Sequence, residues 1–190
     1  MGIFDALLGK RKVKGPAPDR LFALTTAAIA LDAEHDIRTG GKAAIVFQPL
    51  ATGDFAAIVR EMEELVRATS DETGTTLSTT EDSYGYRWMV FDDPDIEDLV
   101  VAVNSVGDAL AVGGYGDRVL CAVFAFAEQS GRRLYFIYNY KRGTWYPFVP
   151  AGGQQQRSTE AELQLRAKLG SELPVEPELE RWFPLWGTPI

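Results

Sequence analysis

The chain has 190 residues, of which 46% are hydrophobic and 24% charged, a balance typical of a single globular domain. Its net charge of −8 argues against a nucleic-acid partner, because phosphate backbones are bound chiefly through Lys and Arg. Cys121 is the only cysteine, which excludes an internal disulfide and a cysteine-built zinc site. The longest apolar stretch, residues 119–127, is too short to span a bilayer. We therefore expect a cytoplasmic protein.

The first 18 residues are predicted to form a basic amphipathic head and a Gly/Pro linker. The apolar residues that would share one side of a helix are Ile3, Phe4, Leu7 and Leu8. The bases that follow them are Lys10, Arg11, Lys12 and Lys14. Such a head suits reversible contact with an anionic membrane surface; a flexible tail, or a helix docked on the protein's own body, is the alternative. Residues 15–18 break the helix, so a single α+β domain is expected over residues 19–190.

Three helices are predicted from apolar residues that recur three or four positions apart. The predicted spans are residues 54–66, 94–112 and 159–170. Asp54 is the predicted N-cap of the first helix, and Asp93 that of the second. In the third helix, Glu162 is predicted to complete a capping box with Thr159.

Short apolar and aromatic runs predict strands, which follow one another in hairpins. The predicted spans are residues 43–48, 84–91, 119–126 and 134–140, with a further strand from Trp145. Residues 26–33 fit a strand or an Ala-rich helix, and we favour a strand because Ile29 and Leu31 alternate with small residues. Consecutive strands favour the α+β class. We expect a largely antiparallel sheet with helices packed on one face.

The C-terminal residues 179–187 form an aromatic arm that is too apolar to remain in water. We expect Trp182, Phe183 and Trp186 to fold back onto the domain, and insertion into a partner is the alternative. The arm therefore counts as part of the same α+β domain.

Aromatic and basic side chains near two predicted turns are the candidate partner-binding residues. These are Tyr84, Tyr86, Trp88, Lys141, Arg142 and Trp145. The first three alternate along one face of a predicted strand, whereas the basic pair projects from an acidic body and suits an acidic partner. The competing interpretation is core packing for the aromatic residues and a solvated hairpin tip for the basic pair. Gly143, in the same hairpin loop, is predicted to have a positive φ.

Few residues could support catalysis. His35, the only histidine, lies in a polar stretch, and Cys121 lies in an apolar run that predicts burial. Residues 81–98 hold seven acids and one base, so a pair such as Asp92 and Asp93 could hold a divalent cation or act as acid and base. The alternative is that these acids cap and open a helix. We expect no enzymatic activity, no cofactor and no resident metal.

Several longer phrases of the sequence carry a resemblance to a known family. They lie at residues 1–9, 80–88, 95–100, 138–148 and 179–187. With these phrases the chain resembles the actinobacterial PspA-associated protein family PspAB. The resemblance implies a link to PspA, the phage-shock membrane-stress protein, and it brings no catalytic residues. The order of strands and helices is also similar to that of secretion-chaperone-like (YbjN-like) domains.

The expected function is that of a non-enzymatic adaptor in the PspA membrane-stress response. It would bind PspA or a PspA-containing complex in the cytoplasm, with peripheral attachment to the inner face of the membrane. One alternative is a chaperone-like dimeric domain that holds client segments in an aromatic groove. The other is a small carboxylate- or metal-dependent hydrolase that uses the acids of residues 92–98.

Overall fold

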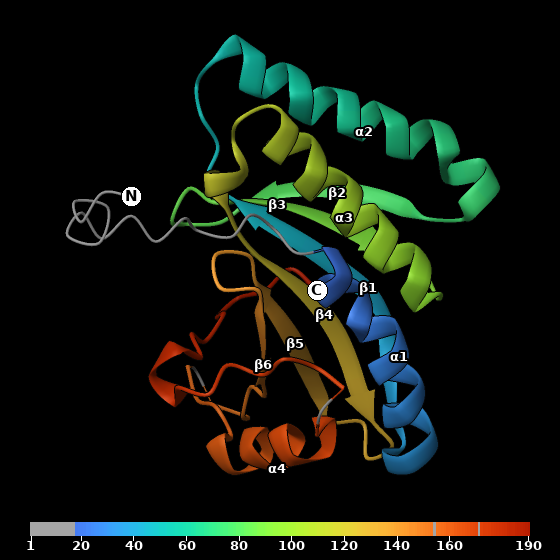
Figure 1. The fold of residues 1–190 in the computed structure, drawn as a ribbon, viewed down its shortest axis with the longest axis vertical. Coiled ribbons are helices and arrows are strands. Elements are labelled where there is room, and N and C mark those ends of the chain that lie inside the picture. Colours follow the sequence, from blue (N-terminus) through green and yellow to red (C-terminus); the bar gives the residue numbers. More distant parts are fainter. Residues whose placement is uncertain (1–17, 154, 171) are drawn as a thin grey trace, which may run out of the picture.

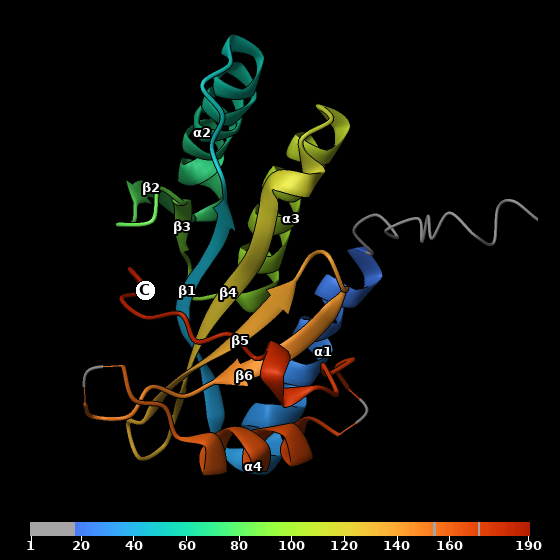
Figure 2. The same cartoon turned by 90° about the vertical axis from the view of Figure 1, so that its left-hand side faces the viewer.

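The computed structural model describes residues 18–153, 155–170 and 172–190, which form an α+β fold, as predicted. Its six strands form one antiparallel sheet in the order β2-β3-β1-β4-β5-β6 (Figures 1 and 2). The strands are β1 (Ile37–Phe47), β2 (Thr76–Glu81), β3 (Arg87–Asp92), β4 (Val119–Glu128), β5 (Arg133–Asn139) and β6 (Thr144–Phe148). The α-helices are α1 (Pro18–His35), α2 (Gly53–Thr73), α3 (Ile96–Val112) and α4 (Thr159–Leu169). Two 3-10 turns, η2 (Gly116–Arg118) and η3 (Leu179–Arg181), complete the described elements.

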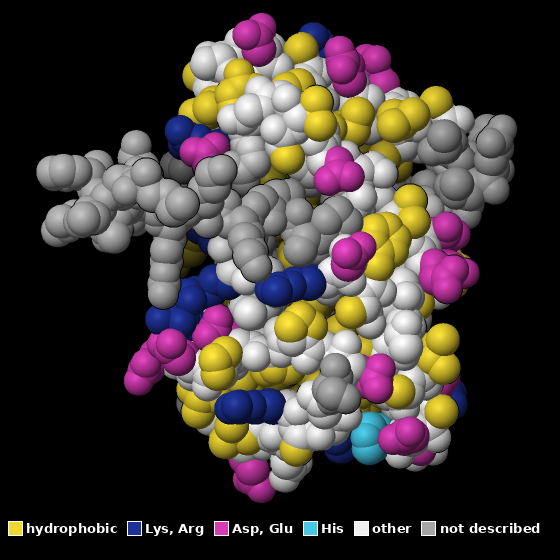
Figure 3. Space-filling model, viewed as in Figure 1, with side chains coloured by type: hydrophobic (Ala, Val, Ile, Leu, Met, Phe, Trp, Pro, Cys, Tyr) yellow, Lys and Arg dark blue, Asp and Glu magenta, His cyan; other side chains and the backbone are white. Residues whose placement is uncertain are grey.

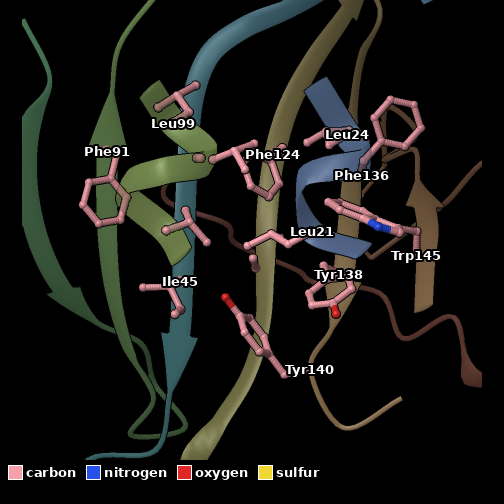
Figure 4. Packing of buried hydrophobic residues seen from close by; sticks show 14 of the residues in the cluster. Leu21, Leu24, Ile45, Phe91, Leu99, Phe124, Phe136, Tyr138, Tyr140 and Trp145 are labelled. Carbon is pink, nitrogen blue, oxygen red and sulfur yellow. The ribbon is translucent and has the colours of Figure 1, made fainter. Parts of the chain in front are cut away.

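The helices cover one face of the sheet, here called the helix face. Side chains alternate along each strand, so Ile45 and Phe47 of β1 point to this face and Val46 points away from it. Leu21 and Leu24 of α1 pack there with the aromatic side chains of β4, β5 and β6 (Figure 4). Figure 3 views the molecule from this side, where apolar and acidic side chains are interspersed over the surface.

The opposite face of the sheet is covered by the C-terminal arm, and we call it the arm face. In Figure 2 the arm crosses the sheet on the side away from α1 and α3. Trp182 is 3% exposed and, with Trp186, packs against the buried apolar side chains that the sheet directs to this face, such as Val46 and Ile137. The prediction that the arm folds back is confirmed for these two residues. Phe183, between them, is 58% exposed and does not join the core.

The prediction of a strand at residues 26–33 is wrong, because these residues lie within α1. The helix buries Leu24, Ala27 and Leu31, which recur at the spacing of one helical face, and leaves Ile29 69% exposed. Ile29 and Leu31 are therefore an exposed and a buried position of one helix, and their spacing of two does not indicate a strand. The sequence assigns no range to β2, because its residues are polar and lack an apolar alternation; in the structure they are mostly exposed.

All three predicted helix caps are shifted by one or two residues. Thr52, not Asp54, is the N-cap of α2, and its side chain makes no capping hydrogen bond. Asp95, not Asp93, caps α3, and its carboxylate accepts a hydrogen bond from the Glu97 N–H. Ser158 caps α4, while Glu162 is buried and turned away from the predicted capping box. Gly113 and Gly170 end α3 and α4, as predicted. The predicted positive φ of Gly143 is confirmed, at 65°.

Tyr140 carries a buried hydroxyl that has no hydrogen-bond partner within the described part of the chain. The hydroxyl faces α3, where a Cβ added to Gly107 would lie 2.9 Å from it. Burial raises the pKa of Tyr140 far above its ordinary value. The hydroxyl has thus lost water without gaining a partner, which lowers the stability of the fold.

We predict that Tyr140→Phe raises the free energy of unfolding by about 1 kcal/mol, because it removes an unsatisfied polar atom at almost constant shape. Urea denaturation measures the change. Tyr135→Phe is the matched control, since the Tyr135 hydroxyl donates to the Ile190 carbonyl at 2.8 Å and its loss should be destabilising. A Tyr140→Phe variant less stable than the natural chain would contradict the prediction.

Candidate binding groove

The arm face contains a cavity of about 500 Å³ that we call the aromatic groove. Its volume lies within the range of ligand-binding clefts. The lining residues are Val46, Asp82, Tyr84, Tyr86, Trp88, Leu120, Cys121, Asn139, Lys141, Tyr146, Phe183, Pro184, Leu185 and Trp186. They come from the sheet, from the turns after β2 and β5, and from the C-terminal arm. The groove is therefore built by segments as far apart in the sequence as Val46 and Trp186.

Two exposed aromatic residues line the groove from two separate segments of the chain. Tyr84, in the turn between β2 and β3, is 76% exposed, and Phe183, in the arm, is 58% exposed. Trp88 and Tyr146 lie deeper in the sheet and are nearly buried. Large aromatic side chains that remain exposed beside a buried apolar floor are characteristic of protein-binding surfaces.

The turn between β2 and β3 is held by Asp82. Its carboxylate accepts hydrogen bonds from the backbone N–H groups of Tyr84 at 2.9 Å and Tyr86 at 3.0 Å. The second carboxylate oxygen accepts from the indole N–H of Trp88 at 3.0 Å. Gly85 has a φ of 79°, a conformation that glycine adopts without strain. The Asp82 carboxylate thus positions the three aromatic residues that the β2–β3 turn and the start of β3 contribute to one wall of the groove.

These hydrogen bonds also determine the acidity of Asp82. Partial burial alone would raise the pKa of its carboxyl. The hydrogen bonds donated by Trp88, Tyr86 and Tyr84 stabilise the carboxylate and together lower the pKa below the ordinary value of 3.8. Asp82 therefore remains ionised at neutral pH and is committed to the structure of the turn.

The other wall of the groove is held in place by Arg157 and Glu162. Glu162 is completely buried and accepts hydrogen bonds from the Val149 N–H at 2.9 Å and from Arg157 at 2.9 and 3.0 Å. Arg157 also donates to the Trp182 carbonyl at 2.6 Å and lies over the Phe148 ring. The guanidinium thereby joins the arm to α4 and β6.

Glu176 provides a second buried attachment of the arm. Its carboxylate accepts a hydrogen bond from Thr144 at 3.1 Å and lies 3.5 Å from Arg181 and 3.9 Å from Arg142. Its carbonyl accepts from the Trp182 indole N–H at 3.0 Å. The Trp182 ring stacks on Tyr146, with the ring centroids 6.4 Å apart. The arm is therefore fixed on both sides of η3.

Of the predicted partner-binding residues, the structure brings four together in the groove. Tyr84, Tyr86, Trp88 and Lys141 all line it. Arg142, the neighbour of Lys141, instead turns to Glu176.

Trp145 must be removed from the predicted set. It is 0% exposed and points to the helix face, where its indole N–H donates to the Arg20 carbonyl at 2.8 Å. Because Tyr146 follows it in the same strand, the two side chains lie on opposite faces of the sheet.

Several groove residues were missed at the sequence level. Asp82 and Asn139 gave no signal, since a polar residue beside a turn is common. Phe183, Leu185 and Trp186 were noticed only as members of an apolar arm. The location of the arm on the sheet depends on the buried carboxylates Glu162 and Glu176, which no local pattern indicates.

The acids of residues 92–98 serve the fold separately and do not converge. Asp92 pairs with Lys42 at 3.0 Å. Asp93 is buried and accepts hydrogen bonds from Thr75 at 2.6 Å and from the Asp95 N–H at 2.8 Å. Among the described residues, no group of three His, Cys, Asp or Glu side chains could hold a metal ion. Burial raises the pKa of the Cys121 thiol to about 12, so the one cysteine in the groove stays protonated.

The predicted membrane-contact residues, Ile3 to Lys14, lie outside the described residues. Within the described residues, no helix is long and apolar enough to cross a membrane.

The fold and the groove define an α+β protein with an aromatic cavity on the face of the sheet that the helices leave free. Comparison with known families then places the chain. The family described as PspA associated protein B matches residues 1–190, so the chain belongs to this family, as the sequence resemblance indicated. Neither the curated proteins nor the solved structures contain a match. The likeness to secretion-chaperone-like domains therefore stays a prediction.

We predict that Asp82→Asn lowers the free energy of unfolding by about 1–2 kcal/mol at neutral pH, because an amide cannot accept all three hydrogen bonds that the carboxylate accepts. Urea denaturation measures the loss. Asp117→Asn, at an exposed acid 3.9 Å from Arg118, is the control and should change little.

The same pair of proteins has a predicted pH dependence. A carboxyl whose pKa is lowered by folding stabilises the protein above its unfolded pKa, and this contribution is lost as the pH falls through the folded pKa. The difference between the natural chain and Asp82→Asn should thus shrink once the pH falls below 3.8. A difference that grows on acidification would contradict this role of Asp82.

Proposed function

We propose that the protein is a non-enzymatic adaptor that binds PspA through the aromatic groove. The observation that carries the proposal is the pair of exposed aromatic residues, Tyr84 and Phe183, that line one groove from two separate segments. Membership in the PspA associated protein B family supports PspA, or a complex that contains it, as the partner. Protein interfaces are enriched in such aromatic side chains, and a few of them supply most of the binding energy.

The polar groups of the groove favour binding over catalysis. Asp82 is ionised and fully engaged by N–H donors, while the Tyr146 hydroxyl donates to the Phe183 carbonyl at 3.1 Å. Cys121 is a protonated thiol. A general base or nucleophile needs a free lone pair and a pKa matched to its task, and none of these three groups offers both.

We also propose that the head, residues 1–14, attaches the adaptor reversibly to the anionic inner face of the membrane. The sequence supports this with four apolar residues followed by four bases. This attachment is independent of the groove. Sedimentation with anionic vesicles should therefore depend on residues 1–14, whereas binding of PspA in solution should not.

We predict that the double variant Tyr84→Ser, Phe183→Ser weakens binding of purified PspA at least about tenfold, because each exposed aromatic contact that is lost removes buried apolar area. Isothermal titration of the full chain measures the dissociation constant. Both positions are largely exposed, so the fold should keep its stability, which thermal denaturation checks.

The control is Ile29→Ser, which removes an exposed apolar side chain from the helix face. It should leave the affinity for PspA unchanged. If Ile29→Ser weakens binding while the double variant does not, PspA binds the helix face and the groove is not its site.

A further inference from the structure

We infer that the groove selects a protein segment in which a bulky apolar side chain stands next to a carboxylate, and that Lys141 is the residue that recognises the carboxylate. The inference rests on the proposed function and names the chemistry of the partner at the same site. Lys141 is exposed, lines the groove and has no ion pair among the described residues.

The body of the groove accepts apolar groups. Val46, Leu120 and Leu185 line it together with the aromatic side chains. Its two deepest polar groups already have partners: the Trp88 indole N–H donates to Asp82, and the Tyr146 hydroxyl donates to a carbonyl of the arm. An inserted apolar side chain therefore leaves these two groups with their partners, whereas a polar side chain would have to compete for them.

The two basic residues of the turn after β5, Lys141 and Arg142, make different contacts. Arg142 lies 3.9 Å from the buried Glu176, so its charge has a partner within the fold. Arg20, from α1, donates to the Gly143 carbonyl of the same turn at 3.1 Å. The backbone N–H of Lys141 donates to the Asn139 side chain at 3.1 Å, which fixes the start of the turn. The Lys141 ammonium group lies beside the apolar cavity and has no ion-pair partner among residues 18–153, 155–170 and 172–190.

The charge of the groove follows from these contacts. Asp82 contributes a carboxylate whose oxygens face the N–H donors of its own turn. Lys141 contributes a cation that no carboxylate of the described part of the chain pairs with, on a chain whose net charge is −8. A segment with an acidic residue next to its apolar anchor complements this arrangement, whereas a basic segment would meet like charge at Lys141.

The occupant is a protein segment because the family link is to a protein. An anionic lipid also combines apolar and acidic parts, and the experiment below includes it as the outcome that would replace the protein segment.

The test is titration of the full chain with purified PspA at low and high salt. Lys141→Met keeps the apolar stem and removes the charge, and it should weaken binding about fivefold at low salt. Lys141→Glu should weaken it about tenfold or more. High salt should reduce the difference between the natural chain and Lys141→Met, since screening weakens an exposed ion pair. The matched control is Lys168→Met, on α4, which should bind as the natural chain does.

The outcomes separate this inference from the proposed function. If the Tyr84→Ser, Phe183→Ser variant loses affinity while both Lys141 variants retain it, PspA binds the groove and the role of Lys141 is wrong. If none of these variants changes the affinity, the groove is not the site and both proposals fail. If Lys141→Met loses binding to vesicles of phosphatidylcholine and phosphatidylglycerol but binds PspA normally, the groove recognises a lipid and the inference is overturned.

Discussion

The ion pair between Arg157 and the buried Glu162 holds the structure together where the chain has least regular secondary structure. A carboxylate inside a protein is costly unless hydrogen bonds and an opposite charge compensate it. Here Arg157 supplies both, and the same guanidinium reaches the Trp182 carbonyl of the arm. If the arm left the sheet, Arg157 would lose the Trp182 carbonyl as an acceptor, and the Trp182 side chain would be exposed to water. Both effects hold the arm in place.

The arm determines what the second face of the sheet can do. In many α+β proteins one sheet face is packed by helices and the other meets solvent. Here the arm covers part of that face through Trp182 and Trp186, and the part left between the arm and the β2–β3 turn is the groove. Glu176 on one side and Asp82 on the other fix the two walls. The carboxylates of Asp82, Glu162 and Glu176 thus position the segments around an apolar cavity, and each of them accepts hydrogen bonds from the fold.

The sequence predicted the fold class because its main signals are local. Apolar residues three or four apart marked α2 and α3, and alternating aromatic residues marked β5. It failed at residues 26–33, since small and apolar residues fit both periods, and only packing of Leu24 and Leu31 against the sheet decides for a helix. It gave no bounds for β2, whose polar strand is specified by pairing with β3 and not by its own composition.

The groove was predictable only in part for the same reason. Tyr84, Tyr86 and Trp88 stood out because they are close in sequence. Trp145 was misassigned because a single position in a strand determines the face of the sheet, and Lys141 could not be told from Arg142 until Glu176 was placed. Strand register decides the first point and the long-range contact with Glu176 decides the second, and no local pattern encodes either.

We propose that PspA binds the arm face of the sheet and not the helix face. Hydrogen–deuterium exchange of the full chain with and without PspA tests it most directly. Binding at the groove should slow exchange at residues 82–88 and 182–187 and leave exchange in α1 unchanged. Slower exchange confined to α1 and α2, with the groove segments unaffected, would contradict it.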